Sequence, residues 1–347
     1  MTDLKFPPRG SFAWQTLVGP YTPDPAALLD PSPIFGLERE NTAVYGCMRS
    51  ASGEIYEALR AIRGTDHEGP EYAEAFGGFL LRSTAGHNDP FMHVMPVSGK
   101  AASSKHPDGK LENGGAVWSS QQNAEGSPWQ VTCDGKTCRW HEENVLDLQG
   151  HLIEPGLQWY MPERSLGMYY ASLLYEVTGT ILEEEVRGFI GIDQIYMPDG
   201  GVLYRHKDTL VGQKVHSLWY TWGTRYKDGT LDAGHFIVGH GRSGFALLTN
   251  EHGEPYYTNN ITARINTRKD ESGQEWQDHI ILNVDGVDWE FLPDPRGTMP
   301  DGSHQATTPQ CEGRWRRVGD EREPDVWFAW GEIAPDHGLE YQPRFRS

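Results

Sequence analysis

Short runs of aromatic and β-branched residues alternate with polar residues along most of the chain, and glycine-containing turns separate one run from the next. Alternation with a period of two is typical of strands that have one face on a core. An Asp-Gly pair between two such runs predicts a hairpin, because it tolerates the positive φ of a tight turn. Such pairs, with their Ser-Gly and His-Gly equivalents, stand at Asp108-Gly109, Asp134-Gly135, Asp199-Gly200, Asp228-Gly229, Asp285-Gly286, Asp301-Gly302, Ser52-Gly53, His252-Gly253 and Ser272-Gly273. The pattern predicts a meander of antiparallel strands.

Helical patterns are scarce in this sequence. Residues 25–29 have one, and residues 57–62 fit either a helix or a strand that follows the preceding Ser-Gly turn. The polar, glycine-containing segment 97–130 is predicted to be a long loop or an irregular hairpin, and segment 294–312 to be similarly loose. The predicted fold class is therefore all-β with few short helices.

The length of 347 residues suggests two domains of ordinary size. A boundary near residues 155–163 separates interrupted strands from a denser series of strands, so we expect an N-terminal β domain over 1–160 and a C-terminal one over 161–347. The 12 Trp, 15 Tyr and 12 Phe, together with 40 Gly, fit a core of large flat side chains joined by tight turns. Each domain is expected to be an antiparallel barrel or sandwich.

The formal charge of −19, from 49 acidic residues against 30 Lys and Arg, argues against nucleic-acid binding and against an anionic membrane surface. No apolar run is long enough to span a bilayer, and the start MTDLKFPPRGSFAW lacks the apolar core of an export signal. We therefore expect a cytoplasmic protein with reduced cysteines. Cys133 and Cys138 are expected to face each other across a hairpin as structural thiols.

The run VHSLWYTWGTRY from Val215 to Tyr226 carries large aromatic residues at both parities, so neither face of this predicted strand is an ordinary solvent face. Either one face lines a cavity, or both faces are buried in a thick β core. The first face has His216, Leu218, Tyr220 and Trp222, and the second has Ser217, Trp219 and Thr221.

The run GFIGIDQIYMP places the carboxylate of Asp193 in an otherwise apolar strand. An unpaired buried carboxylate costs several kcal/mol, so it requires a partner or a raised pKa. A carboxylic acid kept protonated in a hydrophobic cavity is what acid-catalysed hydration or isomerisation of an alkene requires. The alternative is a structural carboxylate that an arginine or backbone amides satisfy.

These runs resemble a known family. The segments YEVTGTI, VRGFIGIDQIY and HSLWYTWGTRYKDGT are similar to the lipocalin-related family of hydroxyneurosporene synthase, in a superfamily with carotenoid hydratases, kievitone hydratase and fungal Diels–Alderases. Asp193 stands at the family's aspartate, whereas Gln194 and Tyr196 stand where His and Trp are usual. The resemblance covers the middle third of the chain.

The resemblance implies two consecutive lipocalin-like β domains that enclose a lipophilic substrate, such as a terpenoid, near their interface without a metal or organic cofactor. Asp193 would be the proton donor, assisted by Tyr196 or His216. The substrate-binding set would be Trp219, Tyr220, Trp222, Arg225 and Tyr226, with Trp219 on the face opposite Tyr220 and Trp222. A homodimer is left open.

Two other readings stay open: a non-catalytic carrier of a hydrophobic ligand, which the departures at Gln194 and Tyr196 favour, and a β-sandwich carbohydrate-active protein. The latter depends on abundant Trp and on the acidic pair that flanks Trp289, namely Asp288 and Glu290, for which a solvated hairpin edge is the simpler explanation. No metal site is predicted. His235 and His240 would point to opposite faces of a strand, and Pro90 interrupts the strand that would join His87 to His93.

Overall fold

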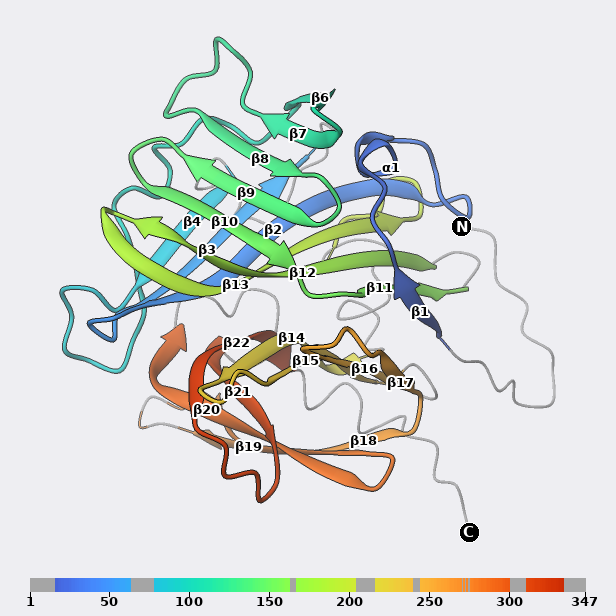
Figure 1. Cartoon of the computed structure of the whole chain (residues 1–347), viewed down its shortest axis with the longest axis vertical. Coiled ribbons are helices and arrows are strands. Elements are labelled where there is room, and N and C mark those ends of the chain that lie inside the picture. Colours follow the sequence, from blue (N-terminus) through green and yellow to red (C-terminus); the bar gives the residue numbers. More distant parts are fainter. Residues whose placement is uncertain are drawn as a thin grey trace.

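The computed structural model describes residues 16–63, 78–162, 167–203, 216–239, 244–269, 271, 273, 275–299 and 310–333. Within these residues the chain is almost entirely antiparallel β-structure, with one short helix, α1 (Pro25–Leu29), whose N-cap is Asp24 (Figure 1). The strands before residue 200 are β1 (Leu17–Tyr21), β2 (Glu38–Ser50), β3 (Ile55–Ile62), β4 (Phe79–Ser83), β5 (His93–Val94), β6 (Asp108–Glu112), β7 (Gly115–Ser119), β8 (Trp129–Cys133), β9 (Thr137–Glu142), β10 (Leu146–Leu152), β11 (Gly156–Met161), β12 (Met168–Ile181) and β13 (Glu184–Met197). The later strands are β14 (His216–Tyr226), β15 (Leu231–Gly239), β16 (Phe245–Asn250), β17 (Tyr256–Thr258), β18 (Ile261–Lys269), β19 (Glu275–Val284), β20 (Val287–Met299), β21 (Gln310–Arg317) and β22 (Pro324–Ile333).

All described strands up to β13 belong to one sheet, the large sheet, in the order β5-β4-β3-β2-β13-β12-β10-β9-β8-β7-β6, with β11 pairing β12 and β1 pairing β11. The sheet curls around a core on its concave side, and α1 lies beside β6 and β7 (Figure 1). The long strands β2, β12 and β13 form its centre. Their outer faces meet the rest of the molecule.

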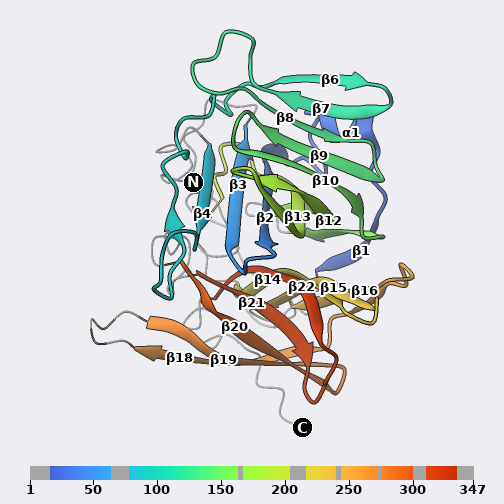
Figure 2. The same ribbon diagram turned by 60° about the vertical axis from the view of Figure 1, so that its left-hand side comes forward.

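The described strands from β14 onward form two further sheets. The middle sheet has the order β17-β16-β15-β14-β22, and the outer sheet has the order β18-β19-β20-β21. Figure 2 shows the middle sheet lying between the large sheet and the outer sheet. Strand β14 therefore has protein on both faces, which explains why its aromatic residues occupy both parities.

The all-β prediction is confirmed, and so are most of the predicted hairpins. Residues 57–62 lie within strand β3. Strands β6 and β7 form a hairpin within segment 97–130, so the hairpin is the one of the two predicted alternatives that this part of the segment adopts. The turn predicted at Asp108-Gly109 is wrong, because these two residues are the first of strand β6. The chain reverses at Asn113 and Gly114 instead. Turns that match the prediction join β2 to β3, β8 to β9, β14 to β15, β16 to β17 and β19 to β20. Asp301-Gly302 and Ser272 lie outside the described residues.

The sheets divide the chain between Met197 and His216. The predicted boundary between residues 160 and 161 lies near the end of β11, within the large sheet, where β12 pairs with both β11 and β13. Sheet membership does not test where an independently folding unit begins. The limits 1–160 and 161–347 therefore stay a prediction.

A buried ion pair lies within the hydrophobic core on the concave side of the large sheet. Arg60 is 0% exposed and Glu142 is 1% exposed, and Nε of Arg60 donates to Oε1 of Glu142 over 2.5 Å. The indole of Trp140 also donates to Oε1 of Glu142 over 2.7 Å, and the guanidinium lies 4.4 Å from the ring centroid of Trp129. Nη1 of Arg60 donates to the hydroxyl of Ser104 over 2.6 Å. These contacts satisfy a charge pair that would otherwise be costly to bury.

The cysteines lie as the sequence predicts. Cys133 is directly opposite Cys138 in the β8–β9 register, and its sulfur lies 2.8 Å from the hydroxyl of Tyr175. Burial raises the pKa of both thiols. Among the described residues, no helix has the length and apolar character needed to cross a membrane.

Candidate functional site

Asp193 lies on β13 at the boundary between the large sheet and the middle sheet, and it is 1% exposed. Its Oδ2 accepts a hydrogen bond of 2.6 Å from the hydroxyl of Tyr170 on the neighbouring strand β12. Its Oδ1 accepts no hydrogen bond of good geometry from the described residues. No arginine pairs with it among the described ion pairs. The predicted alternative was a structural carboxylate that an arginine or backbone amides satisfy, and the described residues provide neither partner.

Burial raises the pKa of the Asp193 carboxyl to about 6, and the neighbouring hydroxyls of Ser172, Tyr170 and Tyr45 oppose this shift. Desolvation dominates because a carboxylate loses its water shell inside the protein, and no cation of the described residues replaces that shell. Near pH 6 the group is therefore protonated in about half of the molecules. That is the range in which a carboxyl group can act as a proton donor.

A chain of buried polar groups continues from this position into the middle sheet. The hydroxyl of Tyr45 on β2 donates to Oγ1 of Thr221 on β14 over 3.0 Å, and that oxygen lies 3.1 Å from Nδ1 of His235 on β15. Burial lowers the pKa of His235 to about 3, so its imidazole is neutral at pH 7. Gly191 makes room for this chain, because a Cβ at that position would lie 2.6 Å from Cζ of Tyr45.

Aromatic rings surround Tyr170 at the same boundary. The ring of Trp159 stacks on Tyr170 with a centroid distance of 5.5 Å, and Trp219 lies 4.9 Å from Tyr170. Phe245 completes the group at 6.1 Å from Trp159. Nε1 of Trp159 is buried and has no hydrogen-bond partner among the described residues. The region thus combines an apolar wall with a protonatable carboxyl and a buried N–H donor.

Of the predicted site residues, Trp219 lies near Asp193, because its ring packs against Tyr170, which donates a hydrogen bond to Asp193. Tyr196 does not lie near Asp193. Tyr196 lies on the opposite face of β13, where it packs against Tyr169 and Leu37. Gln194 shares that face, because its amide donates to the carbonyl of Leu28 over 2.7 Å. The reason is the period of two along a strand, which turns residues 193 and 194 to opposite sides.

Other predicted substrate-binding residues also lie away from Asp193. Tyr220 and Trp222 point into the core between the middle and outer sheets, where the hydroxyl of Tyr220 accepts a hydrogen bond of 3.0 Å from Gln277. Tyr226 is buried, and its hydroxyl donates to Oδ2 of Asp232 over 3.2 Å. The face that looks toward Asp193 is the one with Trp219.

His216 begins β14, where its backbone is opposite Gly239. The register shifts between His216 and Leu218, so alternation along β14 does not fix the face of residue 216. Its side chain lies outside the described part of the structure. Its predicted assistance to Asp193 stays a prediction.

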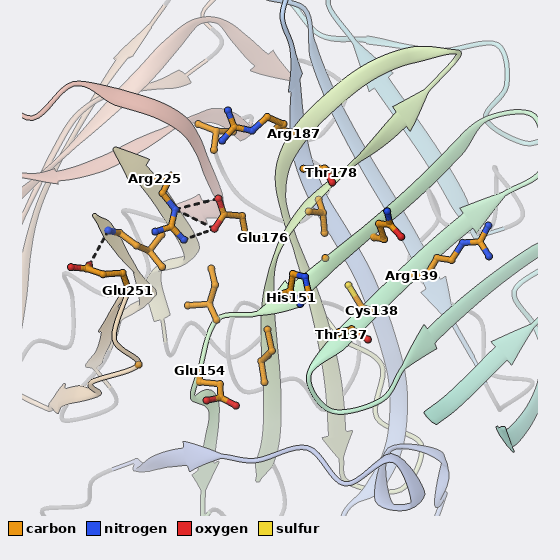
Figure 3. A pocket seen from close by; sticks show the side chains of 18 of the residues that line it. Thr137, Cys138, Arg139, His151, Glu154, Glu176, Thr178, Arg187, Arg225 and Glu251 are labelled. Atoms are coloured by element: carbon orange, nitrogen blue, oxygen red, sulfur yellow. Dashed lines mark hydrogen bonds and ion pairs between the residues drawn. The ribbon is translucent and has the colours of Figure 1, made fainter. Parts of the chain in front are cut away.

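A groove of about 810 Å³ opens along another part of the same boundary, and Asp193 is not among its lining residues. Figure 3 shows Glu176 and Arg225 pointing toward each other across it, from β12 and β14. A second ion pair, Arg187 with Asp325 at 2.8 Å, joins β13 to the start of β22. These pairs connect the large sheet to the middle sheet, so we assign Arg225 to the contact between sheets.

The acidic pair on β20 is engaged by neighbouring side chains, one of which is a cation, rather than poised for catalysis. Oε1 of Glu290 accepts from Nε of Arg316 over 2.7 Å, and Oδ1 of Asp288 accepts from Asn283 over 2.7 Å. Trp289 between them is 2% exposed and packs in the core between the sheets. It therefore offers no open ring face on which a sugar could stack.

Sequence reasoning missed most of the partners of Asp193. Tyr170 and Ser172 precede it on a separate strand, and only the β12–β13 register, which places Ser172 opposite Asp193, brings them together. The sequence draws attention to His235 only as a possible metal ligand together with His240, and not as a neighbour of Asp193. The available signal was the run YYASLLYEV, in which polar atoms at Tyr170 and Ser172 share one parity within an apolar strand.

The raised pKa of Asp193 predicts a pH dependence of stability. Between pH 3.8 and about 6 the native carboxyl keeps a proton that the unfolded chain has released, so a rising pH destabilises the native state. An Asp193→Asn variant cannot ionise. We expect it to gain free energy of unfolding relative to the parent protein across this window, by up to about 3 kcal/mol, and to hold that gain above pH 6.

Urea unfolding of both proteins from pH 4 to pH 8 measures this difference. His235 contributes equally to both proteins, so its opposite pH dependence cancels in the comparison. A difference that stays constant over the whole range would show that the pKa of Asp193 is ordinary.

Comparison with known proteins finds similar backbone structures but no similar sequences. No protein-family model matches the chain, and no curated protein matches it significantly in sequence. Similar solved structures include a protein assigned as an AttH from Nitrosomonas europaea, kievitone hydratase from Nectria haematococca, and CghA with Sch210972. Their identities to this chain are 13%, 10% and 11%, with TM-scores of 0.44, 0.41 and 0.40. The alignments cover 84%, 86% and 92% of this chain and 91%, 92% and 98% of the respective neighbours.

Proposed function

We propose that this protein is a cofactor-independent lyase or isomerase that acts on a lipophilic small molecule between its large and middle sheets, with Asp193 as the general acid. The observation that carries the proposal is the state of that carboxyl beside an aromatic wall, where its hydrogen-bond donor Tyr170 packs against Trp159 and Trp219. It is buried, it has one oxygen without a well-formed hydrogen bond among the described residues, and its pKa is raised to about 6 by desolvation. A structural carboxylate is normally paired instead.

The proposed chemistry begins with proton transfer from Asp193 to one carbon of a substrate double bond. The π electrons form the new C–H bond, and the other carbon becomes cationic. The ring faces of Tyr170 and Trp219 stabilise that cation, because an aromatic face is electron-rich. Addition of water followed by proton loss gives an alcohol, whereas proton loss from a neighbouring carbon gives an isomer. In both outcomes a proton returns to the carboxylate or to water, so the cycle closes without a redox partner.

The test is incubation of the protein with a panel of acyclic isoprenoid alkenes and alcohols in water enriched in deuterium and ¹⁸O. Mass spectrometry of the extracted compounds is expected to show one product with deuterium on carbon, and ¹⁸O as well if water adds. Loss of the label with Asp193→Asn assigns the step to this carboxyl. Label incorporation that is identical in the parent protein and the variant would contradict the proposed role.

A non-catalytic carrier is the second candidate, and one specific observation favours it. Tyr196 and Gln194 face away from Asp193, and burial lowers the pKa of His235, at the far end of the polar chain, to about 3, which makes its imidazole a weak base. None of these residues therefore offers Asp193 a strong base. A carrier would return every bound compound unaltered and unlabelled. It would also bind equally well before and after the Asp193→Asn change, because binding through apolar contacts does not need a transferable proton.

A further inference from the structure

A turn at the edge of the large sheet brings together two imidazoles and one carboxylate that the proposed reaction does not use. His87, Asp89 and His93 lie between β4 and the start of β5, and their potential ligand atoms all lie within 4.8 Å of one another. No other group of three or more metal-ligating side chains occurs within the described residues. We propose that this trio, the edge cluster, binds one divalent transition-metal ion, with Zn²⁺ as the best match.

The distances in the edge cluster are close to those of a metal site. Nε2 of His93 lies 2.9 Å from both carboxylate oxygens of Asp89, and the rings of His87 and His93 stack with centroids 3.8 Å apart. Tetrahedral zinc with bonds near 2.1 Å places its ligand atoms about 3.4 Å apart. Binding would require the His87 side chain to rotate out of its stack on His93, so that the ligand atoms, now within 4.8 Å of one another, reach that spacing. The sequence argued against this pair because Pro90 interrupts a regular strand, but a turn joins the two histidines instead.

The backbone of the turn is already fixed. Oδ1 of Asp89 accepts from the backbone N–H of Phe91 over 3.1 Å, which sets the orientation of the carboxylate. Nη2 of Arg296, on β20, donates to the carbonyl of His87 over 3.0 Å and to that of Thr84 over 2.9 Å. Glu54 pairs with the same guanidinium at 3.0 Å, so its positive charge is compensated. A preorganised turn reduces the ordering cost of binding an ion.

The donor set indicates the class of metal. Two imidazoles and one carboxylate suit zinc and other late first-row divalent ions better than calcium or magnesium, which prefer oxygen ligands. Three protein ligands leave at least one position for water, and all three side chains reach solvent, with His93 35% and Asp89 42% exposed. The segment that carries the cluster also connects the large sheet to the outer sheet, because Met92 donates its N–H to the carbonyl of Thr298 over 2.8 Å. A bound ion would therefore stabilise the contact between these sheets.

The experiment is titration of the metal-free full-length protein with Zn²⁺ by calorimetry, with Co²⁺ absorption as a spectroscopic check on coordination. We expect one site per chain. His87→Ala, Asp89→Asn and His93→Ala should each weaken it at least tenfold. The melting temperature of the parent protein should rise with added Zn²⁺ by mass action, and this rise should be lost in the variants. Circular dichroism of each variant without metal checks that the fold is kept.

The matched control is His141→Ala. His141 also faces a carboxylate, with its Nδ1 3.7 Å from Asp147, but no third ligand completes that pair within the described residues. The control should bind Zn²⁺ as the parent protein does. Unchanged affinity in all three edge-cluster variants, or equal weakening by His141→Ala, would overturn the proposal. These readouts are independent of any conversion at Asp193.

Discussion

Replacing Asp193 by asparagine is expected to slow conversion of a responsive substrate by about 10²–10⁴-fold, the usual contribution of a general acid. The amide can still accept the hydrogen bond from Tyr170, so the packing of β12 against β13 is kept. What it lacks is a transferable proton. The ratio of the steady-state rates of the parent protein and the variant on the same compound measures this reduction. Binding of that compound should change little.

The pH profile separates chemistry from packing in this test. The rate of the parent protein should fall as the pH rises through about 6, because the acid form of Asp193 is then lost. Tyr170→Phe should shift this fall in rate to higher pH, since it removes a hydroxyl that stabilises the carboxylate form of Asp193. Such a shift would show that the hydroxyl of Tyr170 sets the pKa of the Asp193 carboxyl, separately from the contact of its ring with the substrate.

Glu312→Gln is the matched control for Asp193→Asn. Glu312 on β21 is also fully buried, burial raises its pKa to about 7, and its Oε2 accepts from the N–H of Ala329 over 3.2 Å. The control therefore removes a buried acid of the same kind away from Tyr170 and should leave the rate unchanged. A variant at Asp193 that retains the full rate, or a control that loses as much, would exclude the proposed acid.

Breaking the buried ion pair of the large sheet is expected to have the largest effect on stability. Glu142→Gln should lower the free energy of unfolding by about 3–5 kcal/mol, because it leaves the guanidinium of Arg60 buried without a counter-charge. Removal of the whole pair in the double variant Arg60→Met with Glu142→Leu should recover much of this loss. Urea denaturation at pH 7 measures all three proteins.

Asp147→Asn provides the surface control for this prediction. Its partner Arg139 is 53% exposed and Asp147 itself is 42% exposed, so water screens the pair. We expect a loss below about 1 kcal/mol there. Equal losses at the buried and the exposed pair would contradict the reading of Arg60 and Glu142 as the charged centre of the core.

Local patterns in the sequence were sufficient for the fold class. An Asp-Gly or Ser-Gly pair sets a turn through the positive φ that it tolerates, and this is a property of two residues that needs no distant partner. Asp285-Gly286 is an instance, with φ of 48° and 87° between β19 and β20. The exception at Asp108-Gly109 arose because Asn113-Gly114 supplies an equally suitable turn a few residues later.

The sequence also identified Asp193 as an anomalous carboxylate, since charge within an apolar strand is visible without coordinates. It could not identify Tyr170 and Ser172 as its neighbours, because strand register depends on pairing between distant segments. Nor could it choose between the faces of β14. That choice depends on a third layer: the middle sheet buries Tyr220 and Trp222 against the outer sheet and turns Trp219 toward the large sheet.

By itself, then, the sequence determined an antiparallel β protein with hairpin turns, a negative charge that disfavours nucleic acid, and one buried acid. Only the tertiary structure decided which groups surround that acid, that Arg60 and Glu142 meet in the core, and that His87 and His93 share a turn. The physical reason is the distance along the chain over which each kind of interaction acts. Turn preferences and alternation act between near neighbours in the chain, whereas desolvation, ion pairing and ligand geometry are set by side chains that only the packing of the sheets brings together.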